Sequence, residues 1–129
     1  MAIKRAFISF DIDHDEGAKI MLVGQSKYSD SPFEFKDNSV KEHLLGDWKE
    51  KVRRRMDNGD VVIVLCGEYT HTATGVSAEV EIAQQKGKDY FLLAAYSAKT
   101  CTKPKSAKPA DKVYNWTWEN LKILVGGGR

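Results

Sequence analysis

The sequence predicts an α/β domain built on a doubly wound parallel sheet. Two runs are almost wholly apolar, VVIVLC at 61–66 and YFLLAAY at 90–96, as expected for strands that are buried on both faces. Stretches of helical periodicity alternate with the expected strands, and such an order is joined by parallel crossovers, which are nearly always right-handed. The 129 residues, 42% hydrophobic and 29% charged, suit a single domain over 1–129.

The first half of the chain supplies two strands and two helices. Residues 6–10 (AFISF) predict a short buried strand, and the helix formers at 16–26 predict the first helix. Residues 33–35 (FEF) alternate apolar and polar, as a half-exposed edge strand does. Over 40–57 apolar residues recur at helical spacing, and an Asn-Gly pair then ends this helix.

The second half continues the alternation. The loop 67–75 (GEYTHTATG) lacks helical periodicity, and a helix is expected over 76–86. The strand at 90–96 precedes a lysine- and proline-rich segment, 97–112, which we expect to be a long, exposed and mobile loop. A last helix within 115–127 is expected to dock back on the sheet.

These elements predict the strand order 2-1-3-4 of a flavodoxin-like three-layer sandwich, with room for a further edge strand. The order reverses between the first and third strands, and ligands of such sheets bind at that switch point, beyond the carboxyl ends of the strands. The loops 10–16 (FDIDHDE) and 67–75 follow those two strands. The sequence therefore places a candidate site between them.

Composition restricts the compartment and the partners. A formal charge of +2 is too small to require nucleic acid or an acidic membrane surface as a partner. No stretch reaches the roughly 18 apolar residues of a membrane span, and the N-terminus lacks a signal-peptide pattern, so we expect a cytoplasmic protein. Cys66 and Cys101 lack metal-site spacing, and we expect reduced thiols and no metal site. Dinucleotide, P-loop and nucleophile-elbow motifs are missing.

A cluster of acids follows the first strand. Asp11, Asp13 and Asp15 could hold a magnesium ion, as in a phosphoacceptor domain. Such a domain also needs an aspartate after its third strand, where this chain has Cys66 and Gly67. The simpler interpretation is that the acids cap the first helix and interact with its positive end.

Helical geometry singles out Glu79 in the helix expected over 76–86. At about 100° per residue, Glu79 falls within the apolar arc of Val76 and Val80, whereas Glu81 falls outside it. A carboxyl group in an apolar arc is costly unless it is paired, hydrogen-bonded or open to a cleft. From the residues alone, Glu79 is equally a satisfied structural acid or a functional one.

The order and spacing of these motifs resemble a known family. FISFD, SPFEFKDNS, DVVIVLCG and TATGVSAEVEIA, followed by GKDYFLL, are similar to TIR-like (Toll/interleukin-receptor-like) domains of the bacterial Thoeris antiphage type. The resemblance covers about residues 4–96 and continues weakly through YNWTWENLK. It implies a flavodoxin-like sheet and cleavage of NAD at the nicotinamide–ribose bond, after which some members cyclise the ADP-ribose into a signal molecule.

The resemblance also implies partners. NAD would be the substrate, and no separate cofactor is implied. Related domains complete their site with a loop of a neighbouring copy, so self-association is expected, and a signal molecule would reach a separate effector protein. Neither nucleic acid nor a membrane is an expected partner.

Finally, the resemblance assigns residues. The key glutamate of the family matches Glu79, because a small residue and then a Gly-Lys pair follow it at the distances that the family pattern has. Positions that contact the nucleotide or a neighbouring subunit are occupied by Ser9, Phe10, Asp11, Lys36, Asp37 and Asn38, and the motif before Glu79 adds Thr74 and Ser77 as expected substrate-binding residues. Many relatives have a tryptophan where this chain has Gly75. A non-catalytic module that binds a nucleotide or a protein is therefore the alternative.

Overall fold

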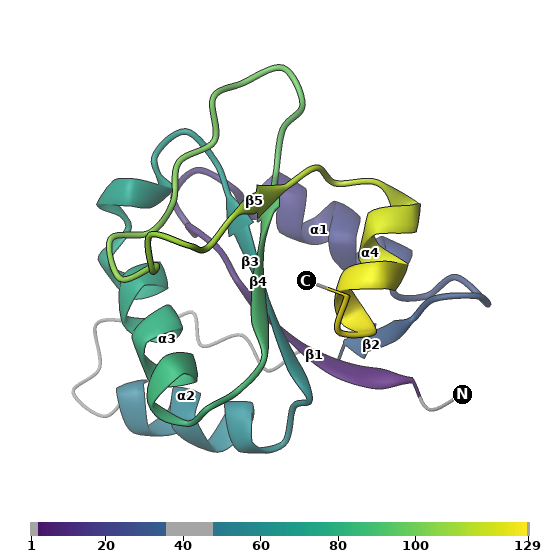
Figure 1. Cartoon of the computed structure of the whole chain (residues 1–129), viewed down its shortest axis with the longest axis horizontal. Helices are drawn as coiled ribbons and strands as arrows, with labels where there is room; N and C mark the ends of the chain where they lie inside the picture. Colours follow the sequence, from purple (N-terminus) through teal and green to yellow (C-terminus); the bar gives the residue numbers. More distant parts are fainter. Residues whose placement is uncertain (1–2, 36–47, 129) are drawn as a thin grey trace.

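A computed structural model of the chain describes residues 3–35 and 48–128 and contains one parallel sheet of five strands (Figure 1). The strands lie in the order β2-β1-β3-β4-β5, which confirms the predicted order 2-1-3-4 and shows that β5 is the further edge strand. Their bounds are β1 (Lys4–Ser9), β2 (Phe33–Phe35), β3 (Val61–Cys66), β4 (Tyr90–Ala94) and β5 (Val113–Tyr114).

The centre of the sheet is β3, which pairs with β1 on one side and β4 on the other. Its pairing with β1 ends at Ser9 opposite Val64, and its pairing with β4 ends at Cys66 opposite Ala94. All residues of β3 are buried, because helices cover both faces of a central parallel strand. The carboxyl ends of β1, β3 and β4 therefore lie at one edge of the sheet.

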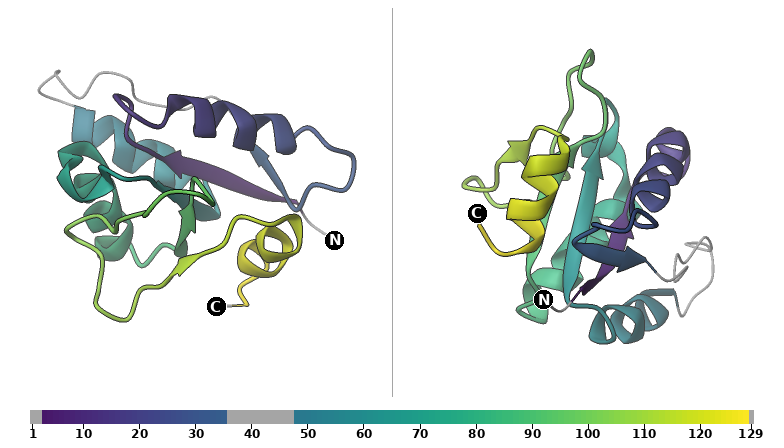
Figure 2. Two further views of the ribbon diagram at one scale, coloured as in Figure 1. Left: turned by 90° about the horizontal axis from the view of Figure 1, so that it is seen from above. Right: turned by 90° about the vertical axis from the view of Figure 1, so that its right-hand side faces the viewer.

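Two helices cover each face of the sheet (Figures 1 and 2). On one side are α1 (Glu16–Gln25) and α4 (Trp118–Val125), whose buried residues form a core with Ile8 and Ile63. On the other side are α2 (Trp48–Asp57) and α3 (Thr74–Gln85), which pack with Phe7 and Val64. Successive strand residues thus face opposite cores, as the alternation of a β-strand requires.

Two helices differ from the sequence-based expectation. α3 begins at Thr74, before the expected 76, and a short 3₁₀ turn, η1 (Thr70–Thr72), lies in the loop that precedes it. The described part of α2 begins at Trp48, so the expected helical residues 40–47 lie outside the described residues. In the part of the chain that the structure describes, no helix is long and apolar enough to cross a membrane.

The segment 97–112 is exposed over 97–100 and 108–110, as expected, but its middle part also contacts the domain. The Thr102 N–H donates to the Gly67 carbonyl over 2.9 Å. The Ser106 N–H donates to Ser77 Oγ over 3.1 Å, and the Ser106 hydroxyl donates to the Ser77 carbonyl. Composition indicated exposure, but these contacts join residues about thirty positions apart along the chain, which composition does not reveal.

Candidate active site

A cavity of about 410 Å³ opens at the carboxyl edge of the sheet. It is lined by residues 10–14 after β1, by Trp48 at the start of α2, and by residues 72–76 at the start of α3. This is the switch point between β1 and β3, where the sequence predicted a site. The cavity therefore lies between the predicted loop 10–16 and the end of the predicted loop 67–75.

Ser9 and Glu79, which are not among the residues that line the cavity, form a buried pair. Ser9 Oγ donates a hydrogen bond of 2.9 Å to Glu79 Oε1, joining the end of β1 to the middle of α3. Ser9 is 1% and Glu79 4% exposed. Val76 lies one turn before Glu79 on α3, and both Val76 and Phe10, the residue after Ser9, line the cavity.

The orientation predicted for Glu79 from helical phase is confirmed. Val76 and Val80 are buried with Glu79, whereas Glu81 is exposed. Burial raises the pKa of Glu79 to about 8, and the hydrogen bond from Ser9 partly offsets that rise. Glu79 is thus a neutral acid at lower pH that gains its charge close to neutrality.

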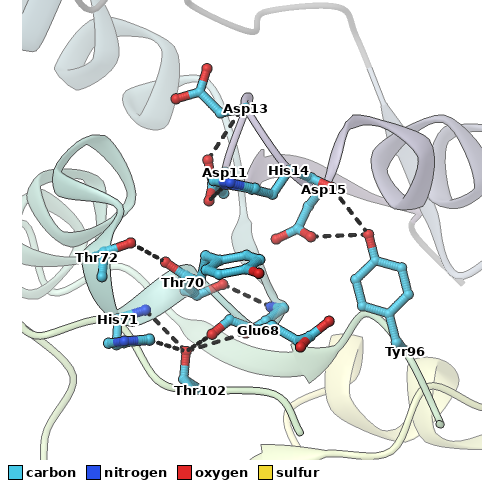
Figure 3. A network of polar contacts seen from close by, with 12 residues as sticks. Asp11, Asp13, His14, Asp15, Glu68, Thr70, His71, Thr72, Tyr96 and Thr102 are labelled. Atoms are coloured by element: carbon cyan, nitrogen blue, oxygen red, sulfur yellow. Dashed lines mark hydrogen bonds and ion pairs between the residues drawn. The ribbon is translucent and has the colours of Figure 1, made fainter. Parts of the chain in front are cut away.

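A polar network includes residues that line the cavity, among them Asp11, Asp13 and His14 (Figure 3). His14 Nδ1 lies 2.7 Å from Asp11 Oδ2, and the His14 ring packs on the Tyr69 ring with centroids 4.3 Å apart. The Asp13 N–H donates to Asp11 Oδ1 over 3.1 Å. These contacts fix the loop after β1, so that Asp11, Asp13 and His14 all line the cavity.

The interpretation that these acids cap α1 through their side chains is wrong. Asp15 is the residue before α1, but its side chain accepts no hydrogen bond from the helix. Instead, Asp15 Oδ1 accepts from the Tyr96 hydroxyl over 3.0 Å (Figure 3). Among residues 3–35 and 48–128, no group of three or more His, Cys, Asp or Glu side chains is arranged to hold a metal ion.

The structure separates the predicted site residues into groups. Phe10, Asp11 and Thr74 line the cavity. Ser9 and Glu79 form a buried pair that is not part of the lining.

Two predicted groups are not part of this arrangement. Ser77 does not line the cavity, because its hydroxyl accepts from the Ser106 N–H of the segment 97–112. Lys36, Asp37 and Asn38 lie outside the described residues.

Sequence reasoning missed Trp48 as a site residue. Trp48 belongs to the apolar repeat over 40–57, which indicated a core side chain; it is half-buried against the core and also lines the cavity together with Gly75. The lining of the cavity thus includes an aromatic side chain from α2 and a glycine from α3. Only the approach of α2 to the start of α3 reveals this, so no local signal could have found it.

A second hollow, of about 720 Å³, lies near the ends of β4 and β5. Tyr96, Lys99, Cys101 and Trp116 are among the described residues that line it, and none of its described lining residues carries a carboxyl group. It contains no predicted site residue. The smaller cavity, which Val76 lines one helical turn before Glu79, is therefore the stronger candidate for chemistry.

The fold and this cavity define an α/β domain of flavodoxin-like strand order with a buried acid at its switch point. The family model of the TIR-like domain of the Thoeris protein ThsB matches residues 7–100, which is more than half of the chain. The chain belongs to this family. The match contains Ser9, Glu79 and the whole cavity lining, whereas α4 lies beyond it. A comparison with curated proteins gives no match.

Proposed function

We propose that this TIR-like domain cleaves NAD at the nicotinamide–ribose bond as part of antiphage defence, with Glu79 as the catalytic carboxyl group. The position of Glu79 carries the proposal: a buried acid, bound by Ser9, lies one helical turn after Val76, which lines the cavity at the switch point of the sheet. Membership of the ThsB family supports NAD as the substrate. No separate cofactor takes part.

The reaction needs a carboxylate near the anomeric carbon. The bond from ribose C1′ to the nicotinamide nitrogen breaks, its electron pair leaves with nicotinamide, and C1′ acquires oxocarbenium-like positive charge. The Glu79 carboxylate stabilises that charge in a site of low dielectric. Water then attacks C1′ and gives ADP-ribose, or a hydroxyl of the same ADP-ribose attacks and gives a cyclic product. Either attack releases one proton to solvent.

The substrate itself promotes the ionised form of Glu79. Without a ligand, burial keeps the pKa of Glu79 at about 8, so the neutral form predominates at pH 7. The nicotinamide ring of NAD carries a positive charge, and a positive charge close to a carboxyl group lowers its pKa. The carboxylate that the reaction requires thus forms when the substrate occupies the cavity.

Other parts of the cavity suit the rest of NAD. Trp48 supplies an aromatic surface for a flat ring. The N-terminal end of α3 has no side-chain cap, and its residues Thr74 and Gly75 line the cavity, where the helix dipole favours a diphosphate. The proposal also includes self-association of the chain and a separate effector protein that responds to the product. Both parts rest on the family resemblance.

The test is release of nicotinamide from NAD by the wild-type chain and by Glu79→Gln, at several protein concentrations, with products resolved by mass. Glu81→Gln is the matched control, because it makes the same change on an exposed position of α3. We expect release by the wild type and by Glu81→Gln and none by Glu79→Gln. Equal release by the two variants would refute the role of Glu79.

A non-catalytic module that binds a nucleotide or a protein is the second candidate. One expectation and one observation favour it: the family resemblance implies a tryptophan at the position of Gly75, and the Ser9–Glu79 pair does not itself line the cavity. This candidate predicts saturable NAD binding without turnover at every protein concentration. Isothermal titration calorimetry with NAD, followed by mass analysis of the same sample, distinguishes the two candidates, because it measures binding and then any conversion of NAD.

A further inference from the structure

The Ser9 side chain is a polar exception on an apolar face. Along β1, Phe7 faces the core formed with α2 and α3, Ile8 faces the opposite core, and Ser9 returns to the side of Phe7. Ser9 is almost fully buried, and a buried hydroxyl is costly unless it is hydrogen-bonded. The contact that satisfies it is the hydrogen bond to Glu79.

We propose that Ser9 is a positioning residue that holds Glu79 by its Oε1 atom and leaves Oε2 for the substrate, and that Ser9 does not itself touch the substrate. This rests on the proposed function of Glu79. A serine hydroxyl has one proton to donate, and here Glu79 Oε1 accepts it over 2.9 Å. Neither Ser9 nor Glu79 is among the residues that line the cavity, so it is the single hydroxyl proton of Ser9, which Glu79 already accepts, that leaves Ser9 no donor for the substrate.

Holding one oxygen restricts the whole carboxyl group. A glutamate side chain has several rotatable bonds, and a bond from a strand residue selects one orientation of the group. Ser9 is itself fixed, because its backbone pairs with Val64 of β3. Through Ser9, β1 therefore fixes the position of the Glu79 side chain on α3. A group that stabilises charge in a transition state must be preorganised in this way.

Three ionisable groups on the elements packed against α3 have partners of their own or are hard to ionise. From β1, Asp11 is bound to His14. From β3, burial raises the pKa of the Cys66 thiol to about 12. From α2, Asp57 pairs with Lys86, at the far end of α3. Ser9 is the polar contact that favours the ionised form of Glu79, against a burial effect that disfavours it.

The first experiment is a titration of the Glu79 carboxyl carbon by ¹³C NMR in the full chain without NAD. Ser9→Ala removes the hydroxyl. Ser9→Thr and Ser9→Val form a matched pair, because they have the same shape and only threonine keeps the hydroxyl. Backbone amide spectra establish that each variant is folded.

We expect the wild type to titrate with a pKa of about 8. Ser9→Ala and Ser9→Val should raise this midpoint by about one pH unit, since a hydrogen bond to a charged group favours the charged form. Ser9→Thr should stay near the wild type. Equal midpoints in Ser9→Thr and Ser9→Val would overturn the proposal, whether or not the chain cleaves NAD.

The second experiment measures nicotinamide release by the same variants as a function of pH. A positioning role predicts that Ser9→Ala lowers kcat about tenfold or more, leaves KM near the wild-type value and moves the rising limb of the pH profile to higher pH. Ser9→Thr should recover activity relative to Ser9→Val. An increase of KM with unchanged kcat would overturn the proposal, because it would show that Ser9 binds the substrate.

The two failures can be told apart. If Glu79→Gln keeps full activity while the carboxyl titration still depends on the Ser9 hydroxyl, the proposed catalytic function is wrong and the contact between Ser9 and Glu79 stands. If Glu79→Gln is inactive while the titration is the same with and without that hydroxyl, the catalytic function stands and the role of Ser9 is wrong.

Discussion

The carboxyl group of Asp15 lies so close to Gly67 that a Cβ atom added to Gly67 would come within 2.4 Å of Asp15 Oδ1. Tyr96 holds this carboxyl group in place with a 3.0 Å hydrogen bond. The loops after β1, β3 and β4 thus meet at the carboxyl edge of the sheet. Among the described residues, Asp15 Oδ2 is a buried carboxyl oxygen without a hydrogen-bond partner, and burial raises the pKa of Asp15.

We predict that Gly67→Ala lowers the free energy of unfolding by about 1–3 kcal/mol, because the added methyl group must displace a buried carboxyl group. Gly24→Ala is the control: nothing lies within 4 Å of its added Cβ, and alanine favours the helix. Urea unfolding measures both. Asp15→Ala should relieve part of the loss in the double variant, and strictly additive effects would contradict a clash between these two residues.

The raised pKa of Glu79 predicts that stability depends on pH in a defined direction. The folded chain retains the Glu79 proton up to about pH 8, whereas the unfolded chain loses it near 4.5. The contribution of Glu79 is therefore fully present below pH 4.5 and is lost as pH rises toward 8. Relative to the wild type, Glu79→Gln should become more stable across this window, by at most about 1.4 kcal/mol per pH unit.

Urea unfolding of the wild type and Glu79→Gln at several pH values measures that difference. Glu81→Gln serves as the control, because Glu81 is exposed on the same helix. A difference between Glu79→Gln and the wild type that does not change between pH 5 and pH 8 would show that Glu79 has an ordinary pKa, contrary to the value of about 8.

Trp48 should contribute to NAD binding more than to the chemical step. Loss of an aromatic surface that stacks on a flat ring weakens binding, so Trp48→Ala should raise KM or the dissociation constant for NAD by roughly tenfold. Trp48→Phe should retain most of the affinity. Trp118→Ala is the control, because Trp118 lies on α4 and its indole donates to Asp30, away from the cavity. An equal loss in both alanine variants would indicate a general effect on stability.

The segment 97–112 should show protected backbone amides where it contacts α3. The Ser106 N–H donates to Ser77 Oγ, and Gln84 and Tyr90 add side-chain bonds to Ser106 and Asp111. In hydrogen exchange followed by NMR, Ser77→Ala should speed exchange at Ser106 by about fivefold or more, because one hydrogen bond is lost. Exchange at Thr102 should change little. Fast exchange at Ser106 in the wild type would instead support the sequence-based expectation of a mobile loop.

The periodic features of this protein were accessible from its sequence. Two apolar runs predicted the central strands, and the alternation with helices predicted the order that the sheet adopts. The phase of α3 predicted that Glu79 faces inward and Glu81 outward. Each of these follows from spacing within one short stretch of chain, since a helix or strand repeats its faces at a fixed period.

The hydrogen-bond partners of the buried acids were decided by the tertiary structure. Ser9 and Glu79 are 70 positions apart, and Asp15 and Tyr96 are 81 apart, so no local period connects them. The contacts of 97–112 with α3 were also decided by the tertiary structure. The composition of that segment, rich in lysine, serine and proline, indicates only exposure to solvent. The sequence by itself determined that Glu79 lies on the buried face of its helix. Only the packing of α3 on β1 decided that the Ser9 hydroxyl contacts it there, because contacts between distant segments form when the sheet and helices assemble.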